Sequence, residues 1–172
     1  MRSLFLAAFA VFAFLNLNAQ GDDDHGPIQE GKWQIEINTG SWTTGSTAFS
    51  LTSVDGETMW SVGGEGGYFV ADDLAIKAGL GYSDFGDDFS SFSYKIGAKY
   101  YINSEFPVGL DFTGTSFKDF DENPSYVGIE GGYAWFITQK VSVEPKLRYN
   151  ISMNSDFYDD ALQVLIGFAI HL

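Results

Sequence analysis

The sequence has no cysteine, two histidines, and nine lysine and arginine residues against 23 aspartate and glutamate residues. The lack of cysteine excludes disulfides, thiolate chemistry and a lipid-modified N-terminal cysteine. The net charge of −14 argues against a nucleic-acid partner, because phosphate binding needs clustered lysine and arginine. The body of the chain also lacks the run of about 20 apolar residues that a membrane-spanning helix needs.

The N-terminus differs from the rest of the chain. Arg2 precedes an apolar run over residues 4–15, and Ala19 supplies a small residue before a polar stretch. This pattern predicts a secretory signal peptide over residues 1–19, cleaved between Ala19 and Gln20, since the run is short for a membrane anchor. Residues 20–31 are acidic and interrupted by glycine and proline, so we expect a disordered tail before one domain at 32–172.

Apolar and polar residues alternate with a period of two in eight segments of this domain. The segments are 33–39, 60–68, 74–83, 92–102, 108–113, 127–135, 142–150 and 162–172. Long acidic connections at 41–57, 84–91, 118–124 and 153–160 alternate with tight ones at 71–73, 103–106 and 138–140. The pattern predicts an all-β, eight-stranded, antiparallel up-and-down barrel with long loops at one end and short turns at the other.

The stretch SVEPKLRYN at 142–150 raises the question of which face of the barrel meets water. One face carries Val143, Pro145, Leu147 and Tyr149, and the other carries Glu144, Lys146 and Arg148. A soluble ligand-binding barrel would turn the apolar face inward, whereas a membrane barrel turns it outward. Eight strands enclose a space that side chains just fill, and a ring of aromatic residues would overfill it. We therefore expect a polar lumen and an apolar exterior that contacts lipid.

Charge balance on the inward face supports the same orientation. Alternation assigns five acids and five bases to the lumen: Glu36, Glu65, Asp111, Glu130 and Glu144 with Lys77, Lys95, Lys99, Lys146 and Arg148. Charges in a low-dielectric lumen need partners, whereas surface charges do not. A hairpin centred on Gln139 places Glu130 across from Arg148, and we expect this pair to be bidentate and the strongest lumen contact. Pro145 lacks an N–H, so we expect a bulge or a missing hydrogen bond there.

Aromatic residues fall into two groups along the predicted strands. Trp33, Tyr68, Tyr100, Tyr133, Trp135 and Phe168 lie near the short-turn end, and Trp42, Trp60, Tyr82, Phe92, Tyr94 and Tyr149 lie near the long-loop end. Tryptophan and tyrosine concentrate at the two interfaces of a bilayer. The two groups therefore predict aromatic belts on either side of an apolar band.

The chain resembles the small outer-membrane β-barrel family typified by the transmembrane domain of OmpA and by OmpX. The resemblance covers 32–172 and depends on the signal peptide, the eight strands, the segments GGYFVADDLAIKAGLGYS and GGYAWFITQKVSVEPKLRY, and the last strand. It implies a cell outer-membrane location in a Gram-negative organism and delivery by periplasmic chaperones. It also implies that the barrel-assembly machinery recognises the terminal strand, where Gly167, Ile170 and Leu172 match the family's spacing.

The sequence leaves three functions to compare. The first is a structural or surface-interaction scaffold, a monomeric barrel whose acidic loops repeat aspartate beside phenylalanine and contact lipopolysaccharide or a surface partner. The second is a narrow or gated pore, which ten charged side chains in an eight-stranded lumen disfavour. The third is a lipid-modifying enzyme, which needs a nucleophile and a base near the long loops, whereas His171 points inward at the other end. We expect no catalytic residues, cofactor or metal site.

Overall fold

A computed structural model of the chain describes residues 26–40, 47–54, 57–86 and 89–172. These form ten β-strands: β1 (Trp33–Asn38), β2 (Ser50–Val54), β3 (Glu57–Ala71), β4 (Leu74–Asp84), β5 (Ser90–Ile102), β6 (Phe106–Phe117), β7 (Ser125–Gly132), β8 (Trp135–Thr138), β9 (Val141–Ser152) and β10 (Ala161–His171). The predicted signal peptide, its cleavage site at Ala19 and Gln20, residues 20–25 and Trp42 lie outside the described residues. In the described part, no helix is long and apolar enough to cross a membrane.

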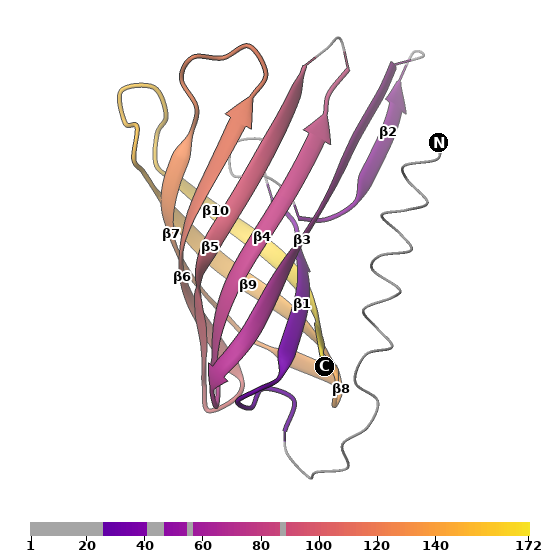
Figure 1. Cartoon of the computed structure of the whole chain (residues 1–172), viewed down its shortest axis with the longest axis vertical. Helices are drawn as coiled ribbons and strands as arrows, with labels where there is room; N and C mark the ends of the chain where they lie inside the picture. The colour runs from indigo at the N-terminus through magenta and orange to yellow at the C-terminus, as the bar shows by residue number, and fades with distance from the viewer. Residues whose placement is uncertain (1–25, 41–46, 55–56, 87–88) are drawn as a thin grey trace.

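The strands form a closed antiparallel barrel (Figure 1). Closure occurs at β1, which pairs with β10 on one edge and with β3 on the other. Two of the eight strand positions around the barrel are each filled by two short strands. β1 and β2 pair with the lower and upper parts of β3, and β7 and β8 both pair with β9. The ten strands therefore occupy eight positions, which confirms the predicted eight-stranded up-and-down barrel.

The main differences from the predicted boundaries concern β2, β3 and β6. β2 falls inside the segment expected to be a loop at 41–57, β3 begins at Glu57 instead of at residue 60, and β6 extends to Phe117 instead of ending at 113. The residues of β2, SLTSV, are mostly small and polar, so their alternation is weak. They become a strand because the antiparallel ladder with β3 satisfies their backbone groups.

The break between β7 and β8 lies opposite Pro145. Gly132 pairs with Lys146 before the break and Trp135 pairs with Val143 after it, so the register is the same on both sides. The Tyr133 N–H donates to the Pro145 carbonyl at 3.2 Å, but proline has no N–H with which to return a bond. The ladder therefore lacks a hydrogen bond at Pro145, as predicted, and residues 133–134 interrupt the strand opposite it.

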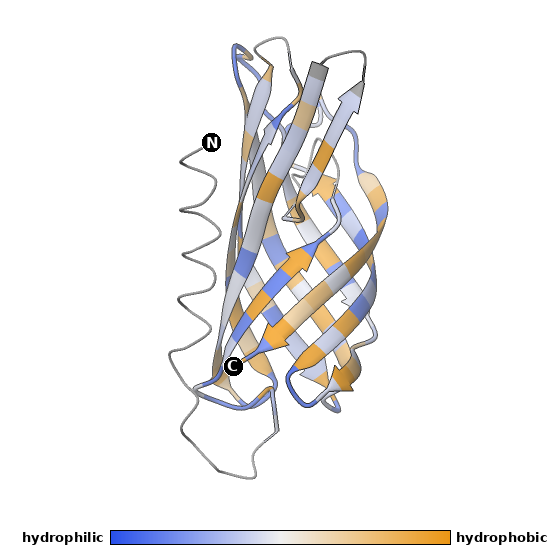
Figure 2. Cartoon of the chain, turned by 90° about the vertical axis from the view of Figure 1, so that its right-hand side faces the viewer, coloured by the Kyte–Doolittle hydropathy of each residue, from blue (hydrophilic) through white to orange (hydrophobic). Residues whose placement is uncertain are grey.

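The outer surface is apolar around the barrel. Hydrophobic and hydrophilic residues alternate along the strands (Figure 2), and the side chains on the outward set are exposed, among them Leu80, Ile96, Leu110, Ile129, Leu147 and Val164. Rings pair near both ends: Trp33 with Tyr68 at 4.9 Å between centroids, and Trp60 with Tyr82 at 5.3 Å. Aromatic rings therefore lie near both ends of the apolar band, as expected for two bilayer interfaces.

The N-terminal segment differs from the predicted disorder from residue 26 onward. Residues 26–31 are ordered against the short-turn end of the barrel, and the Ile28 side chain is buried. The Gly31 N–H donates to the Phe69 carbonyl at 2.9 Å, and the Asp73 N–H donates to the Ile28 carbonyl at 2.8 Å. The prediction of disorder was based on the average composition of residues 20–31. In the structure, one buried apolar side chain and a few backbone hydrogen bonds hold residues 26–31 in place.

Candidate functional site: a charged network across the lumen

All ten charged residues assigned to the lumen by alternation point into it. Eight are buried, and Lys95 and Asp111 are partly buried. They come from seven strands: Glu36 on β1, Glu65 on β3, Lys77 on β4, Lys95 and Lys99 on β5, Asp111 on β6, Glu130 on β7, and Glu144, Lys146 and Arg148 on β9. Each has at least one ion-pair partner.

Glu36 is the centre of the network. Its carboxylate accepts hydrogen bonds from Lys77 at 2.7 Å and Lys99 at 2.9 Å, and it also pairs with Lys146. These lysines stand on β4, β5 and β9, none of which is adjacent to β1 in the barrel wall. The contacts therefore span the lumen instead of following one wall. The Gln34 side-chain amide adds a fourth donor at 3.0 Å.

Two further carboxylates extend this centre along the barrel axis. Glu144 pairs with Lys99 and accepts the Tyr101 hydroxyl at 2.8 Å, toward the short-turn end. Glu65 pairs with Lys77 and Lys95, each at 2.9 Å, toward the long-loop end. Lysines shared between carboxylates thus join these groups into one continuous cluster.

Arg148 has a different main partner from the predicted one. Glu130 lies directly across from it in the β7–β9 register, as expected, but at 3.3 Å through one nitrogen. The bidentate partner is Asp111 on β6, which receives both terminal nitrogens of the guanidinium, one of them at 2.6 Å. The long side chain reaches past its neighbour strand to the next one, so the prediction of a bidentate Glu130 pair was wrong.

Glycine makes this reach sterically possible. Gly128 on β7 lies between Asp111 and Asn150 in the ladder, and the guanidinium of Arg148 rests on it. A Cβ atom placed on Gly128 would lie 1.9 Å from a terminal nitrogen of Arg148. Gly109 similarly faces Glu130, and Gly79 faces Glu65, where an added Cβ would lie 2.8 and 2.7 Å from the respective Cγ atoms. Inward glycines therefore provide the space that the charged side chains occupy.

Two aromatic side chains in the lumen were not among the predicted site residues. Phe69 and Tyr101 are fully buried beside His171, with ring centroids 6.4 Å from the imidazole in both cases. The sequence did contain a signal, since Tyr68 and Tyr100 were assigned outward and the next residue on a strand faces the other way. These rings close the lumen below the charged network.

Ser142, His171 and Glu144 lie close together without forming a catalytic triad. The Ser142 hydroxyl is 3.0 Å from His171 Nε2 and donates to Glu144 at 3.1 Å. His171 Nδ1 has no hydrogen-bond partner among the described residues, so no acid orients the imidazole. All three side chains are also buried, which leaves no access for a substrate. The three side chains therefore add hydrogen bonds to the buried lumen network.

Two cavities beside the charged network are small. A cavity on the long-loop side of the network, lined in part by Asn38, Ser93, Lys95 and Gln163, leaves about 20 Å³ for the centres of water molecules. A second cavity beside Lys77 and Glu130 leaves about 10 Å³. These volumes suit one or two waters. These two cavities therefore leave room for only a few water molecules beside the charged network.

The loops at the other end of the strands contact one another. The Asn154 amide donates to Glu122 at 3.1 Å, and the Tyr158 hydroxyl donates to the Glu122 carbonyl at 2.9 Å, which joins 118–124 to 153–160. Hydrogen bonds from the Ser152 N–H and then the Tyr149 hydroxyl lower the pKa of Asp160. In the described part of the chain, no three acidic or histidine side chains converge as a metal site would require.

Phenylalanine rings join the connection at 84–91 to the end of β6 and to the loop at 118–124. Phe89 stacks on Phe117 at 5.5 Å between centroids and lies 5.7 Å from Phe120, while Phe85 contacts Phe89 at 5.3 Å. Phe117 is buried and Phe120 is exposed. The phenylalanines of the acid–aromatic repeats therefore include rings that pack the loops together, besides rings that face outward.

Comparison with solved structures identifies the class of fold. The N-terminal β-barrel domain of Pseudomonas aeruginosa OprF is similar over 83% of this chain and 98% of that chain, with a TM-score of 0.50 and 14% sequence identity. The Yersinia pestis outer membrane protein Ail gives 83% and 100% coverage, a TM-score of 0.49 and 13% identity. The outer membrane protein OprG from Pseudomonas aeruginosa is similar over 84% of this chain and 98% of that chain, with a TM-score of 0.47 and 12% identity.

The fold is that of a small eight-stranded outer-membrane β-barrel, as the sequence predicted. The chain also covers nearly the whole length of the solved barrels. No protein-family model matches the chain, and comparison with curated proteins gives no match. At these identities the likeness concerns the fold, so function has to be argued from the residues of this chain.

The role of glycine in the lumen can be tested with a matched pair of variants. Gly128→Ala should lower the free energy of unfolding by about 1–3 kcal/mol, because the added methyl displaces the Arg148 guanidinium. Gly131→Ala, three residues along the same strand, has no atom within 4 Å of the new methyl and should be neutral or slightly stabilising. Urea titration of the refolded protein measures both. Equal losses would contradict the packing role of Gly128.

The partner of Arg148 can be tested with two double-mutant cycles. Removing Asp111 should cost about 3–5 kcal/mol, because it leaves a buried guanidinium without its bidentate partner. The coupling energy of Asp111→Ala with Arg148→Ala should exceed that of Glu130→Ala with Arg148→Ala. Asp159→Ala in an exposed loop serves as the control and should change little. A larger coupling for Glu130 would restore the pairing expected from the sequence.

Proposed function

We propose that this chain is a monomeric, non-conducting outer-membrane protein whose barrel acts as a scaffold for the acidic loops at its long-loop end. The observation that carries this proposal is the Glu36 junction, where lysines from three strands, none of them adjacent to β1, meet one carboxylate across the lumen. A channel needs a continuous aqueous path, and these buried side chains occupy it. Displacing them would leave charges unpaired in a low-dielectric space, which is costly.

Export and insertion form part of the same proposal. The signal peptide at 1–19 would direct the chain to the periplasm, and the terminal strand would present Gly167, Ile170 and Leu172 to the barrel-assembly machinery. In the folded barrel Gly167 lies inward against Glu36 and Asn38, and Leu172 exchanges backbone hydrogen bonds with Trp33 at the closure of the barrel. The same residues would thus serve first as a recognition signal and then as the closing seam.

The partners we propose are outer-membrane lipid along the apolar band and lipopolysaccharide or a surface protein at the loops. The loop end has exposed Phe120, Met153 and Phe157 among several acids. Direct contact of these acids with lipopolysaccharide phosphates would be repulsive, so such contact would need divalent cations between them. A non-enzymatic role agrees with the sealed positions of Ser142 and His171.

Orientation in the membrane can be tested with epitope insertions. A short tag between Ser155 and Asp156 should bind antibody on intact cells, because this loop stands at the end we place outside. The same tag between Gln139 and Lys140 should bind only after the outer membrane is permeabilised. Both insertions fall at exposed positions between strands. Binding to the Gln139 insertion on intact cells would reverse the proposed orientation.

Conductance separates the scaffold from the alternative of a narrow or gated pore. Refolded protein added to a planar bilayer should give no discrete conductance steps, while a general porin in the same bilayer serves as the positive control. Migration that changes on boiling in a gel shows that the sample is folded. Reproducible single-protein steps from the folded material would overturn the proposal and favour the pore.

A further inference from the structure

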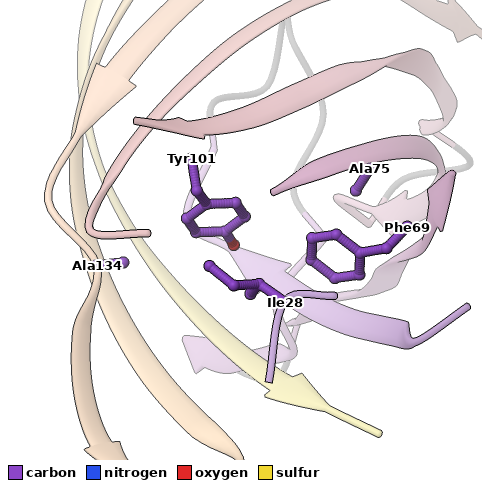
Figure 3. Close-up of a cluster of buried hydrophobic side chains, with 5 residues drawn as sticks. All are labelled: Ile28, Phe69, Ala75, Tyr101 and Ala134. Carbon is purple, nitrogen blue, oxygen red and sulfur yellow. The ribbon is translucent and has the colours of Figure 1, made fainter. Parts of the chain in front are cut away.

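The short-turn mouth of the barrel is closed by a side chain from outside the strands. Ile28 inserts among four buried residues that stand on different parts of the wall (Figure 3): Phe69 on β3, Ala75 on β4, Tyr101 on β5 and Ala134 between β7 and β8. Ile28 itself is only 4% exposed, although its neighbours Gly26 and Glu30 are exposed. It is the one aliphatic residue of residues 20–31.

Hydrogen bonds hold this segment in place at Ile28 and at the residues that follow it. Its carbonyl accepts the Asp73 N–H at 2.8 Å, and the Glu30 N–H donates to the Asp72 carboxylate at 3.0 Å. The Gly31 N–H donates to the Phe69 carbonyl at 2.9 Å. The segment is therefore docked on the β3–β4 turn with defined geometry, and its position does not depend on one apolar contact.

The docked segment lies between the solvent at the mouth and the charged network. Tyr101 connects the two layers, because its ring belongs to the apolar cluster and its hydroxyl donates to Glu144. The His171 ring lies 5.2 Å from Phe136, which packs against the same cluster. Without Ile28, water would have a direct route to these groups, and the ion pairs behind them would lose their low-dielectric surroundings.

We propose that residues 26–31 are a stopper that seals the short-turn mouth of the lumen, with Ile28 as the sealing side chain. The charged network blocks the middle of the barrel, and the stopper controls access of water and small solutes to it from the short-turn side. This proposal deepens the non-conducting barrel proposed above by naming what closes one mouth. Labelling of the mouth and bilayer conductance are separate measurements, so either proposal can fail without the other.

The absence of cysteine allows a direct test. Ala75→Cys places a single thiol beneath Ile28, at a position with no exposure, and Thr115→Cys places one in the lumen of the opposite half. The Thr115 hydroxyl has no hydrogen-bond partner among the described residues, so its loss should be tolerated. Each thiol is combined with Ile28→Ala or with the control Gln29→Ala, and its reaction with a small polar maleimide is followed in detergent-refolded protein.

Ile28→Ala should accelerate labelling at position 75 by about tenfold or more. Truncating this buried side chain removes packing energy, so the docked segment should open more often and expose the thiol. Labelling at position 115 should stay unchanged, and Gln29→Ala should affect neither thiol. If Ile28→Ala does not fold, Ile28→Val should give a smaller acceleration confined to position 75. Fast labelling of position 75 with Ile28 present, an unchanged rate in the Ile28 variants, or equal acceleration at both positions would overturn the stopper.

Discussion

A charge placed inside a narrow barrel has to find its counter-charge there, and this constraint organises the lumen. Glu36 satisfies it by pairing with three lysines from other strands. Each of these lysines also pairs with a second carboxylate: Lys77 with Glu65, Lys99 with Glu144 and Lys146 with Glu130. Because the lysines bridge carboxylates, no ion pair in the centre is independent of the others. Loss of one partner would leave a charge that has no water to replace it.

The same constraint explains where glycine occurs on the inward face. A barrel of eight strands has room for one layer of long side chains, and each of these must lie over a neighbouring strand to reach its partner. At Gly128 beneath Arg148 and at Gly109 beside Glu130, the missing side chain leaves the space that the neighbouring charged side chain occupies. Gly64, Gly66 and Gly131 on the outward face have no such contact.

Polar and apolar layers support each other along the axis. The buried cluster around Phe69 and Tyr101 adjoins the network through the Tyr101 hydroxyl, and low-dielectric surroundings of this kind strengthen ion pairs. The ion pairs in turn fix the strands to which these rings belong. Such a filled lumen suits a rigid support for surface loops, and the loops have their own contacts through Glu122 and Phe89.

The period of two and the tight turn at Gln139 are local properties of the chain. They were enough to predict the architecture, the inward set of ten charges and the register of Glu130 opposite Arg148. The sequence also located the ladder defect at Pro145. The bidentate pairing of Arg148 with Asp111 could not be predicted in this way, since it depends on how far the Arg148 side chain reaches across the curved sheet over Gly128. Strand β2 and the seating of Ile28 likewise depend on partners distant in sequence, β3 and the short-turn mouth. Their local composition predicts a loop or a tail, and long-range pairing and burial overrode it.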